Sequence, residues 1–448
     1  MMENEKMKIT PTNNKEKGEG TGMLRAVFAL VSGNTVAMAV GFLISPLLTR
    51  LFSPDEFGVL NLFLSISGVL ILFANAEFHN SIMLPKSEYK AVACTHLGML
   101  TTMAACLLFL LGVILFFSLD FEVGPIGNWL WLIPIYAFLQ AIWNILNNWY
   151  TRTKHFWLIS SFQVSQSLGN AALKSLFGWL KLPHNGLISG TIIGSLIALV
   201  LSVATSLKQL RPLLRFDGLA CKVMALRYVN FPKYSLPRAL VNYVSGNLPI
   251  LLLSAYFSMD YIGFFGMATM LAFRPINMIS YSLCQVFYQK SAEMYRDHKP
   301  LMPFFRRFSK NTLMIVVPSF LALYYILPWL VSFLFGEEWV ETGTYIQMML
   351  PWLAMSTIVA SMGFLFDLFL MQKMGLIFEI INIVMRLLSL GYGIWVDDFS
   401  TAILVYCLSN FVVICVQYIW YYRIIRKYDN SLSDLWVNLR GATCSNLR

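Results

Sequence analysis

The chain has 448 residues, of which 57% are hydrophobic and only 12% are charged, and its formal net charge is +10. Soluble domains carry about 25% charged residues, so this composition excludes a water-facing surface for a chain of this length. The five histidines and seven cysteines form no group with metal-ligand spacing, so neither a zinc site nor a disulfide framework is expected. The composition predicts a membrane protein that holds no cofactor.

Residues 1–22 are polar and mixed in charge, which is typical of a solvated tail. After this tail the sequence contains twelve apolar segments of about 20 residues or more, the length that a helix needs to cross a bilayer. The predicted spans are 26–49, 57–76, 91–118, 128–150, 157–180, 185–206, 239–257, 261–288, 311–335, 345–371, 374–396 and 400–422. The expected fold is therefore an all-α polytopic membrane protein.

The basic residues gather in alternate loops. Of the 33 Lys and Arg residues, 28 lie in the two terminal segments or in the loops 77–90, 151–155, 207–238, 289–310 and 372–374. The opposite loops hold only Arg50 and Lys181 and are otherwise acidic. An excess of Lys and Arg marks cytoplasmic loops, so both termini are expected in the cytoplasm. The same pattern accounts for most of the net charge, and nucleic acid is not expected as a partner.

The longest basic loop divides the spans into two groups of six. The expected parts are a disordered cytoplasmic tail, an N-terminal lobe, a basic cytoplasmic linker, a C-terminal lobe and a cytoplasmic C-terminal tail, at 1–22, 23–206, 207–238, 239–424 and 425–448. A weak internal repeat agrees with this division. SPDEFG at 53–58 resembles SMDYIG at 258–263, and Ser-Gly-Asn occurs at 32–34 and at 245–247. Two six-helix halves are typical of transporters, with the binding site at the repeat interface.

Four spans carry polar side chains at intervals of three or four residues, which places them on one helix face. They are Gln140, Asn144, Asn147 and Asn148; Gln163, Gln166, Asn170 and Lys174; Arg274, Asn277, Tyr281 and Gln285; and Glu379, Asn382, Arg386 and Ser389. One interpretation is hydrogen bonding between helices. The three cations in the spans, against the two acids Asp367 and Glu379, instead favour a central water-filled cationic cavity, because unpaired charge is costly in lipid.

A cationic cavity favours an anionic cargo, since Arg binds phosphate through two parallel hydrogen bonds and Lys acts as a point charge. The residues predicted to bind it are Lys174, Arg274, Arg386, Gln163, Asn170, Asn277 and Asn382. A buried carboxyl can hold a proton or Na⁺, so the candidates for ion coupling are Asp367, Glu379 and Glu77. A structural pair between Glu379 and Arg386, two helical turns apart, is the alternative. The sequence has no catalytic or nucleotide-binding motif, and no enzyme or metal site is predicted.

Residues 32–64 resemble the opening of the bacterial polysaccharide-transporter family, the O-antigen flippases. That opening is a first span ending in Arg, a Ser-Pro-Asp/Glu-Phe-Gly turn and an apolar second span, matched here by Arg50, Ser53, Pro54, Glu56, Phe57 and Gly58. The resemblance implies membership of the multidrug/oligosaccharidyl-lipid/polysaccharide superfamily, whose members have twelve or more helices in two six-helix lobes around a V-shaped cavity. Arg50 joins the candidate binding residues through this motif.

The activity implied by the resemblance is the movement of an undecaprenyl-pyrophosphate-linked oligosaccharide from the cytoplasmic to the periplasmic leaflet of the bacterial inner membrane by alternating access. The expected partners are this polyprenyl-pyrophosphate-linked oligosaccharide, membrane lipids, H⁺ or Na⁺, and the polysaccharide polymerase and chain-length components. Three alternatives stay open. They are a multidrug extrusion antiporter, which would favour an acidic cavity, a membrane-embedded polymerase or ligase of lipid-linked sugars, which would have a large external loop, and a non-transporting scaffold.

Overall fold

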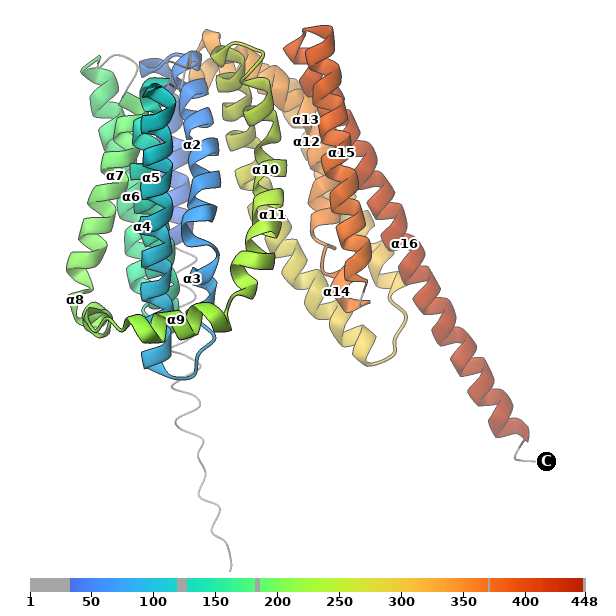
Figure 1. The fold of residues 1–448 in the computed structure, drawn as a ribbon. Helices are drawn as coiled ribbons and strands as arrows, with labels where there is room; N and C mark the ends of the chain where they lie inside the picture. The colour runs from blue at the N-terminus through green and yellow to red at the C-terminus, as the bar shows by residue number, and fades with distance from the viewer. Residues whose placement is uncertain (1–32, 119–126, 182–185, 370, 446–448) are drawn as a thin grey trace, which may run out of the picture. The chain divides into compact units, whose positions relative to one another are not determined.

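The computed structural model describes residues 33–118, 127–181, 186–369 and 371–445, and this part of the chain forms helices and turns without a strand (Figure 1). The expected tail at 1–22 lies outside the described residues. The helices of 18 or more residues are Gly33–Leu51, α2 (Pro54–Asn75), α4 (Glu88–Ser118), α5 (Ile133–Arg152), α6 (Phe156–Trp179), α7 (Gly186–Thr205), α10 (Leu236–Leu253), α11 (Met259–Arg296), α12 (Met302–Phe335), α13 (Val340–Ala360), α15 (Gln372–Val396) and α16 (Phe399–Ser445).

Each of the twelve predicted spans overlaps one of these long helices, which confirms the prediction of an all-α polytopic membrane protein. Eight of the long helices can cross a membrane by length and composition alone. The other four, α6, α10, α11 and α13, have the length but carry more polar side chains, including the predicted stripes of α6 and α11. Polar faces of this kind are tolerated in a span only where they meet protein or water.

The predicted tenth span, 345–371, is wrong at its C-terminal end, because α13 stops at Ala360. A turn follows at residues 361–364, and then the four-residue helix α14 (Leu365–Leu368). Successive bonds between residues three apart replace the α-helical pattern, with Met362 N–H donating to the Val359 carbonyl at 3.0 Å. The Ser361 hydroxyl donates to the Thr357 carbonyl at 2.7 Å, and such a local bond competes with the helical ladder.

The described residues divide into two compact units, one made of 33–45 and 66–241 and the other of 46–65 and 242–445. Helix Gly33–Leu51 and α2 each contribute residues to both units. The expected lobes at 23–206 and 239–424 stay a prediction.

In the first unit, α6 packs closely along α7 because glycines on α7 leave room for α6. A Cβ atom on Gly190 would lie 2.8 Å from Cγ of Lys174, and one on Gly194 would overlap the side chain of Asn170. Trp143 of α5 stacks on Phe162 of α6 with ring centroids 3.4 Å apart. The predicted linker 207–238 also belongs to this unit and is largely helical, as α8 (Leu207–Leu210), η2 (Arg211–Leu214), α9 (Gly218–Arg227) and η3 (Phe231–Ser235).

In the second unit, the two segments of the sequence repeat pack against each other. A Cβ atom on Gly58 of α2 would overlap the carbonyl group of Met259, and one on Gly263 of α11 would overlap the carbonyl group of Pro54. Met259 and Gly263 occupy in the second segment the positions that Pro54 and Gly58 occupy in the first. The contact is therefore reciprocal, as expected for two repeats related by a pseudo-twofold axis.

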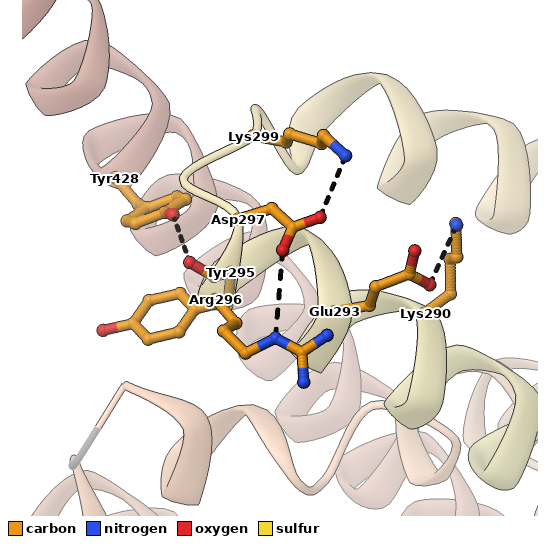
Figure 2. A network of polar contacts seen from close by, with 7 residues as sticks. All are labelled: Lys290, Glu293, Tyr295, Arg296, Asp297, Lys299 and Tyr428. Atoms are coloured by element: carbon orange, nitrogen blue, oxygen red, sulfur yellow. Dashed lines mark hydrogen bonds and ion pairs between the residues drawn. The ribbon is translucent and has the colours of Figure 1, made fainter.

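The turn between α11 and α12 is fixed to α16 by polar contacts (Figure 2). The Tyr428 hydroxyl donates to the Tyr295 carbonyl at 3.4 Å, and the Asp429 carboxylate accepts from the backbone N–H groups of Leu301 and Met302, both at 2.8 Å. Asp429 thereby satisfies N–H groups at the start of α12 that have no partner within the helix. The ion pairs Lys290–Glu293 (3.0 Å) and Lys299–Asp297 (2.9 Å) in the same region are exposed and contribute little to stability.

Candidate functional site

The polar stripe of α6 lies in the first unit, and α7 divides it into two kinds of side chain. Gln166 donates to the Ser195 hydroxyl of α7 at 3.0 Å, and Gln140 of α5 donates to the same oxygen at 3.2 Å. For these two amides the interpretation as hydrogen bonds between helices is correct. Gln163 Oε1 and Asn170 Oδ1 are buried and accept no hydrogen bond from the described part of the chain. These two carbonyl oxygens keep their capacity to accept from another molecule.

Lys174 lies one turn beyond Asn170 on α6 and is half-buried. Its aliphatic stem packs beside Gly190 of α7, where a side chain would leave no room for it. A Lys stem can bury its methylene groups in this way while its ammonium group reaches a more polar environment. Gln163, Asn170 and Lys174 therefore form a group of candidate binding residues on one helix of the first unit.

Arg386 of α15 lies in the second unit and is held by hydrogen bonds. Its Nη1 donates to the hydroxyl (2.8 Å) and the carbonyl (3.0 Å) of Ser245 in α10, and its Nε donates to Asn410 Oδ1 of α16 at 3.1 Å. The alternative of a pair with Glu379 is wrong, since the guanidinium binds Ser245 and Asn410 instead. Glu379 and Asn382 lie half-buried on the same helix. Arg386 therefore joins three helices of the second unit.

Arg274 and Asn277 of α11 have a different environment, since both are exposed in the second unit. Arg274 makes no hydrogen bond to another described residue, and α11 continues as a helix through the adjacent Pro275. Tyr281 and Gln285 continue the stripe in the sequence, but their side chains lie outside the described residues. The guanidinium of Arg274 is therefore open to a ligand.

Arg50 and the motif around it lie at the start of α2. Arg50 is exposed at the end of the first helix. Ser53 and Glu56 form a capping box, in which the Ser53 N–H donates to Glu56 Oε2 at 2.9 Å and the Glu56 N–H donates to the Ser53 hydroxyl at 3.4 Å. Ser53, Glu56 and Gly58 thus have structural roles in beginning and packing a helix, and Arg50 is the motif residue that stays available for binding.

The candidates for ion coupling separate by burial. Glu77 lies outside the spans, between α2 and α3 (Phe78–Ser81), and is only 8% exposed. Burial raises the pKa of its carboxyl above the ordinary value, while the hydrogen bond from Asn80 Nδ2 (2.5 Å) and the charge of Arg238 oppose this shift. Glu77 has a left-handed backbone with φ of 60°, an uncommon conformation for a residue other than glycine. The Asp367 side chain lies outside the described residues.

Sequence reasoning missed Ser195 and Asn410 as buried partners of the stripes, and it noted Ser245 without its role as a partner of Arg386. Ser245 belongs to the Ser-Gly-Asn repeat, and Asn410 is an amide in an otherwise apolar stretch of α16, so each gave a weak signal. No group of three or more His, Cys, Asp or Glu residues that would hold a metal ion occurs in the described ranges. The predicted binding residues belong to two units, with Gln163, Asn170 and Lys174 in the first and Arg50, Arg274, Asn277, Asn382 and Arg386 in the second.

Solved structures with a similar fold are transporters. The lipid II flippase MurJ in an inward closed conformation aligns with 91% of this chain and 91% of its own, at 13% identity and a TM-score of 0.67. An inward-facing multidrug resistance MATE family transporter of the MOP superfamily aligns over 91% and 99%, at 13% identity and a TM-score of 0.60. A mutant of the Vibrio cholerae MATE transporter VcmN aligns with 91% of this chain and 97% of its own, at 13% identity and a TM-score of 0.56.

The sequence itself matches a family described as "Polysaccharide biosynthesis protein" over residues 47–344, about two thirds of the chain. No curated protein matches the sequence at a comparable level. At 13% identity the solved structures show the fold alone, which this chain shares with the flippase MurJ and with a MATE transporter of the MOP superfamily. The fold and the family match agree with the resemblance found at residues 32–64, and the chain belongs to this family of polysaccharide biosynthesis proteins.

Proposed function

We propose that the protein is a flippase for an oligosaccharide linked to polyprenyl pyrophosphate, which it moves from the cytoplasmic to the periplasmic leaflet of the bacterial inner membrane. The observation that carries the proposal is the exposed guanidinium of Arg274 in a helix of spanning length. A charge at membrane depth costs at least about 2.5 kcal/mol on insertion scales, and this cost is lowered where the charge meets water or an anion. The family match supports a cargo used in polysaccharide biosynthesis.

In this mechanism the pyrophosphate is the anion, and Arg274 binds it. Lys174 adds positive charge in the first unit. Arg386 contributes positive charge while it stays fixed to Ser245 and Asn410. The amides of Gln163, Asn170, Asn277 and Asn382 hydrogen-bond sugar hydroxyls, and the polyprenyl tail stays in lipid. Alternating access opens the site to either side of the membrane in turn, and H⁺ or Na⁺ binding at a buried carboxyl such as Glu77 resets the empty carrier. Such coupling requires that the ion bind one state better than the other.

The proposal is tested by reconstituting the purified protein in liposomes with a labelled polyprenyl-pyrophosphate oligosaccharide and measuring exchange between leaflets. The variant Arg274→Gln loses one charge-assisted contact to phosphate, which is worth about 1.5–3 kcal/mol. Its leaflet exchange should therefore be slower than that of the wild type by about tenfold or more. Lys290→Gln is the matched control, because Lys290 is an exposed cation on the same helix, paired with Glu293. Exchange in Arg274→Gln equal to that in the control would contradict the site. Drug efflux without lipid exchange by the wild type would support an extrusion antiporter instead.

A further inference from the structure

The segment 211–227 of the first unit lies against the start of α4 and is attached to it at several points. His96 Nε2 of α4 is 2.7 Å from the Leu213 carbonyl, Cys221 Sγ is 3.5 Å from the Ala93 carbonyl, and the Tyr89 hydroxyl donates to the Asp217 carboxylate. Asp217 also caps α9 by accepting from the N–H groups of residues 219 and 220. Figure 1 shows α9 running across α4. The segment is thus a fixed part of the unit.

Helix α9 has apolar side chains on two opposite faces. Cys221 and Met224 form the face toward α4, and each is 3% exposed. Leu219, Val223 and Leu226, at spacings of four and three residues, share the other face, where Leu219 is 74% and Leu226 is 70% exposed. A helix that has water on its outer side normally carries polar residues there. The outer face of α9 is therefore expected to contact an apolar environment other than α4.

Two further apolar side chains precede this outer face, and cations surround it. Leu214 is 82% and Phe216 is 61% exposed. Lys222 and Arg227 lie on either side of the apolar stripe of α9, Arg211 begins η2, and Arg215 lies between η2 and α9; all four are exposed. Apolar residues bordered by Lys and Arg are typical of helices that lie in the headgroup region of a bilayer. The cations would meet the phosphates of anionic lipids there.

The position of the segment fits a membrane surface. The contacts of residues 89, 93 and 96 lie in the first turns of α4, which continues as a spanning helix to Ser118. Because α9 packs on the side of these turns, its outer face points away from α4 at the depth where that helix enters the membrane. The segment also follows soon after the end of the spanning helix α7 at Thr205.

We propose that residues 211–227 bind the headgroup region of the surrounding membrane. Leu214, Phe216, Leu219, Val223 and Leu226 enter the acyl boundary, and Arg211, Arg215, Lys222 and Arg227 bind anionic phospholipid headgroups. The contacts with Tyr89, Ala93 and His96 then hold the start of α4 at a fixed depth. This inference does not depend on the cargo or on the direction of transport.

The test is amide hydrogen exchange, measured on the full chain in nanodiscs of phosphatidylcholine alone and with about one third phosphatidylglycerol. Each cation near an anionic surface contributes about 1 kcal/mol, so exchange in 211–227 should be at least about fivefold slower with phosphatidylglycerol. The variant Arg211→Gln/Arg215→Gln/Lys222→Gln/Arg227→Gln should lose this difference. The control Lys290→Gln/Arg296→Gln/Lys299→Gln, which removes exposed cations of the second unit, should retain it in 211–227.

A second readout separates lipid binding from burial by protein. Introducing Leu219→Trp adds an indole on the outer face, and dibrominated phospholipids should quench this added fluorescence. Equal exchange in both lipid mixtures, together with an indole that these lipids do not quench, would overturn the proposal and point to a protein partner. Amide hydrogen exchange in α4 and α7 that is as slow as in the wild type shows that a variant is folded. If exchange in these helices is faster in the Gln variant, that variant is misfolded and the quenching of the Leu219→Trp variant decides the result.

Discussion

Three cations lie within the predicted spans, and their surroundings differ. Arg386 donates three hydrogen bonds to α10 and α16, whereas the Arg274 side chain is exposed. Lys174 is intermediate, with its stem against Gly190 and its position next to buried, unpartnered amide oxygens. A planar guanidinium is required where several acceptors must be met at fixed angles, but a point charge is sufficient for electrostatic attraction alone. Substitution by lysine therefore distinguishes a structural cation from a binding one.

We expect Arg386→Lys to lower the stability of the protein by about 1–3 kcal/mol, because it leaves the buried oxygens of Asn410 or Ser245 without a donor. Arg274→Lys should leave stability nearly unchanged, since no hydrogen bond to the described residues is lost. Thermal unfolding in detergent, followed by the intrinsic tryptophan fluorescence, measures both. Equal melting temperatures for the two lysine variants would show that the bonds of Arg386 contribute no stability.

His79 lies outside the spans in the short helix α3, where burial lowers its pKa to about 4. Its Nδ1 has no hydrogen-bond partner among the described residues. In the unfolded chain the imidazole titrates near its ordinary value of 6.5. Between these two values the unfolded state binds the proton and the folded state does not. Stability is therefore complete above pH 6.5 and falls as the pH decreases toward 4.

The variant His79→Asn should reduce this acid dependence, by up to about 1.4 kcal/mol for each pH unit between 6.5 and 4. The measurement compares melting temperatures of the variant and the wild type across this range, so that other titrating groups cancel. The control is His155→Asn, which removes an exposed histidine. A wild type and a His79→Asn variant with the same dependence on pH would show that His79 is protonated normally in the folded protein.

At the scale of elements, the repeated segments explain why the motif at 53–58 has its particular residues. Ser53 and Glu56 begin α2, and Gly58 permits the backbone of α2 to meet that of α11. Gly263 does the same from the other side of the crossing. The motif at 53–58, which marks the family resemblance in the sequence, thus serves largely to begin α2 and to pack it against α11.

We expect Gly58→Ala and Gly263→Ala each to destabilise the second unit by about 1–3 kcal/mol, as overpacking does in other cores. The new methyl group would overlap a backbone carbonyl, which has no other rotamer to adopt. The matched control is Gly246→Ala in α10, where a Cβ atom has nothing within 4 Å and the change should be neutral or stabilising. Unaltered melting of both variants would show that the two helices do not approach this closely.

The helices were predictable because length and hydrophobicity identify a spanning segment, and each predicted span overlaps one long helix. The end of α13 was not, since Ser361 and Gly363 interrupt a stretch that is still apolar. The sequence also identified the cations but not their partners. Asn410 and Ser245 meet Arg386 only because α10, α15 and α16 pack together. A polar stripe on one helix does not reveal which residues of the neighbouring helices it will meet.

At the scale of the whole molecule, the distribution of charge determines how the chain is expected to lie in the membrane. The Lys and Arg residues that flank the spans set the orientation of a membrane protein. Here 28 of the 33 Lys and Arg residues fall in alternate segments that include both termini. Twelve long helices occur in the described residues, and an even number of spans would return the chain to the side from which it started. The basic segment 211–227 is expected on the same side as the termini.

This topology predicts the result of reporter fusions to the full chain and to its truncations in a bacterial host. Green fluorescent protein fused after Arg448 should fluoresce, because it folds in the cytoplasm, and alkaline phosphatase there should be inactive. Phosphatase fused after Lys181, one of the two cations of the acidic side, should be active because that enzyme needs the periplasm to form its disulfides. A fusion after Arg215 should behave like the one after Arg448. If the fusions after Lys181 and Arg448 report the same side, the number of spans between them is even, and the prediction that these two positions lie on opposite sides of the membrane is wrong.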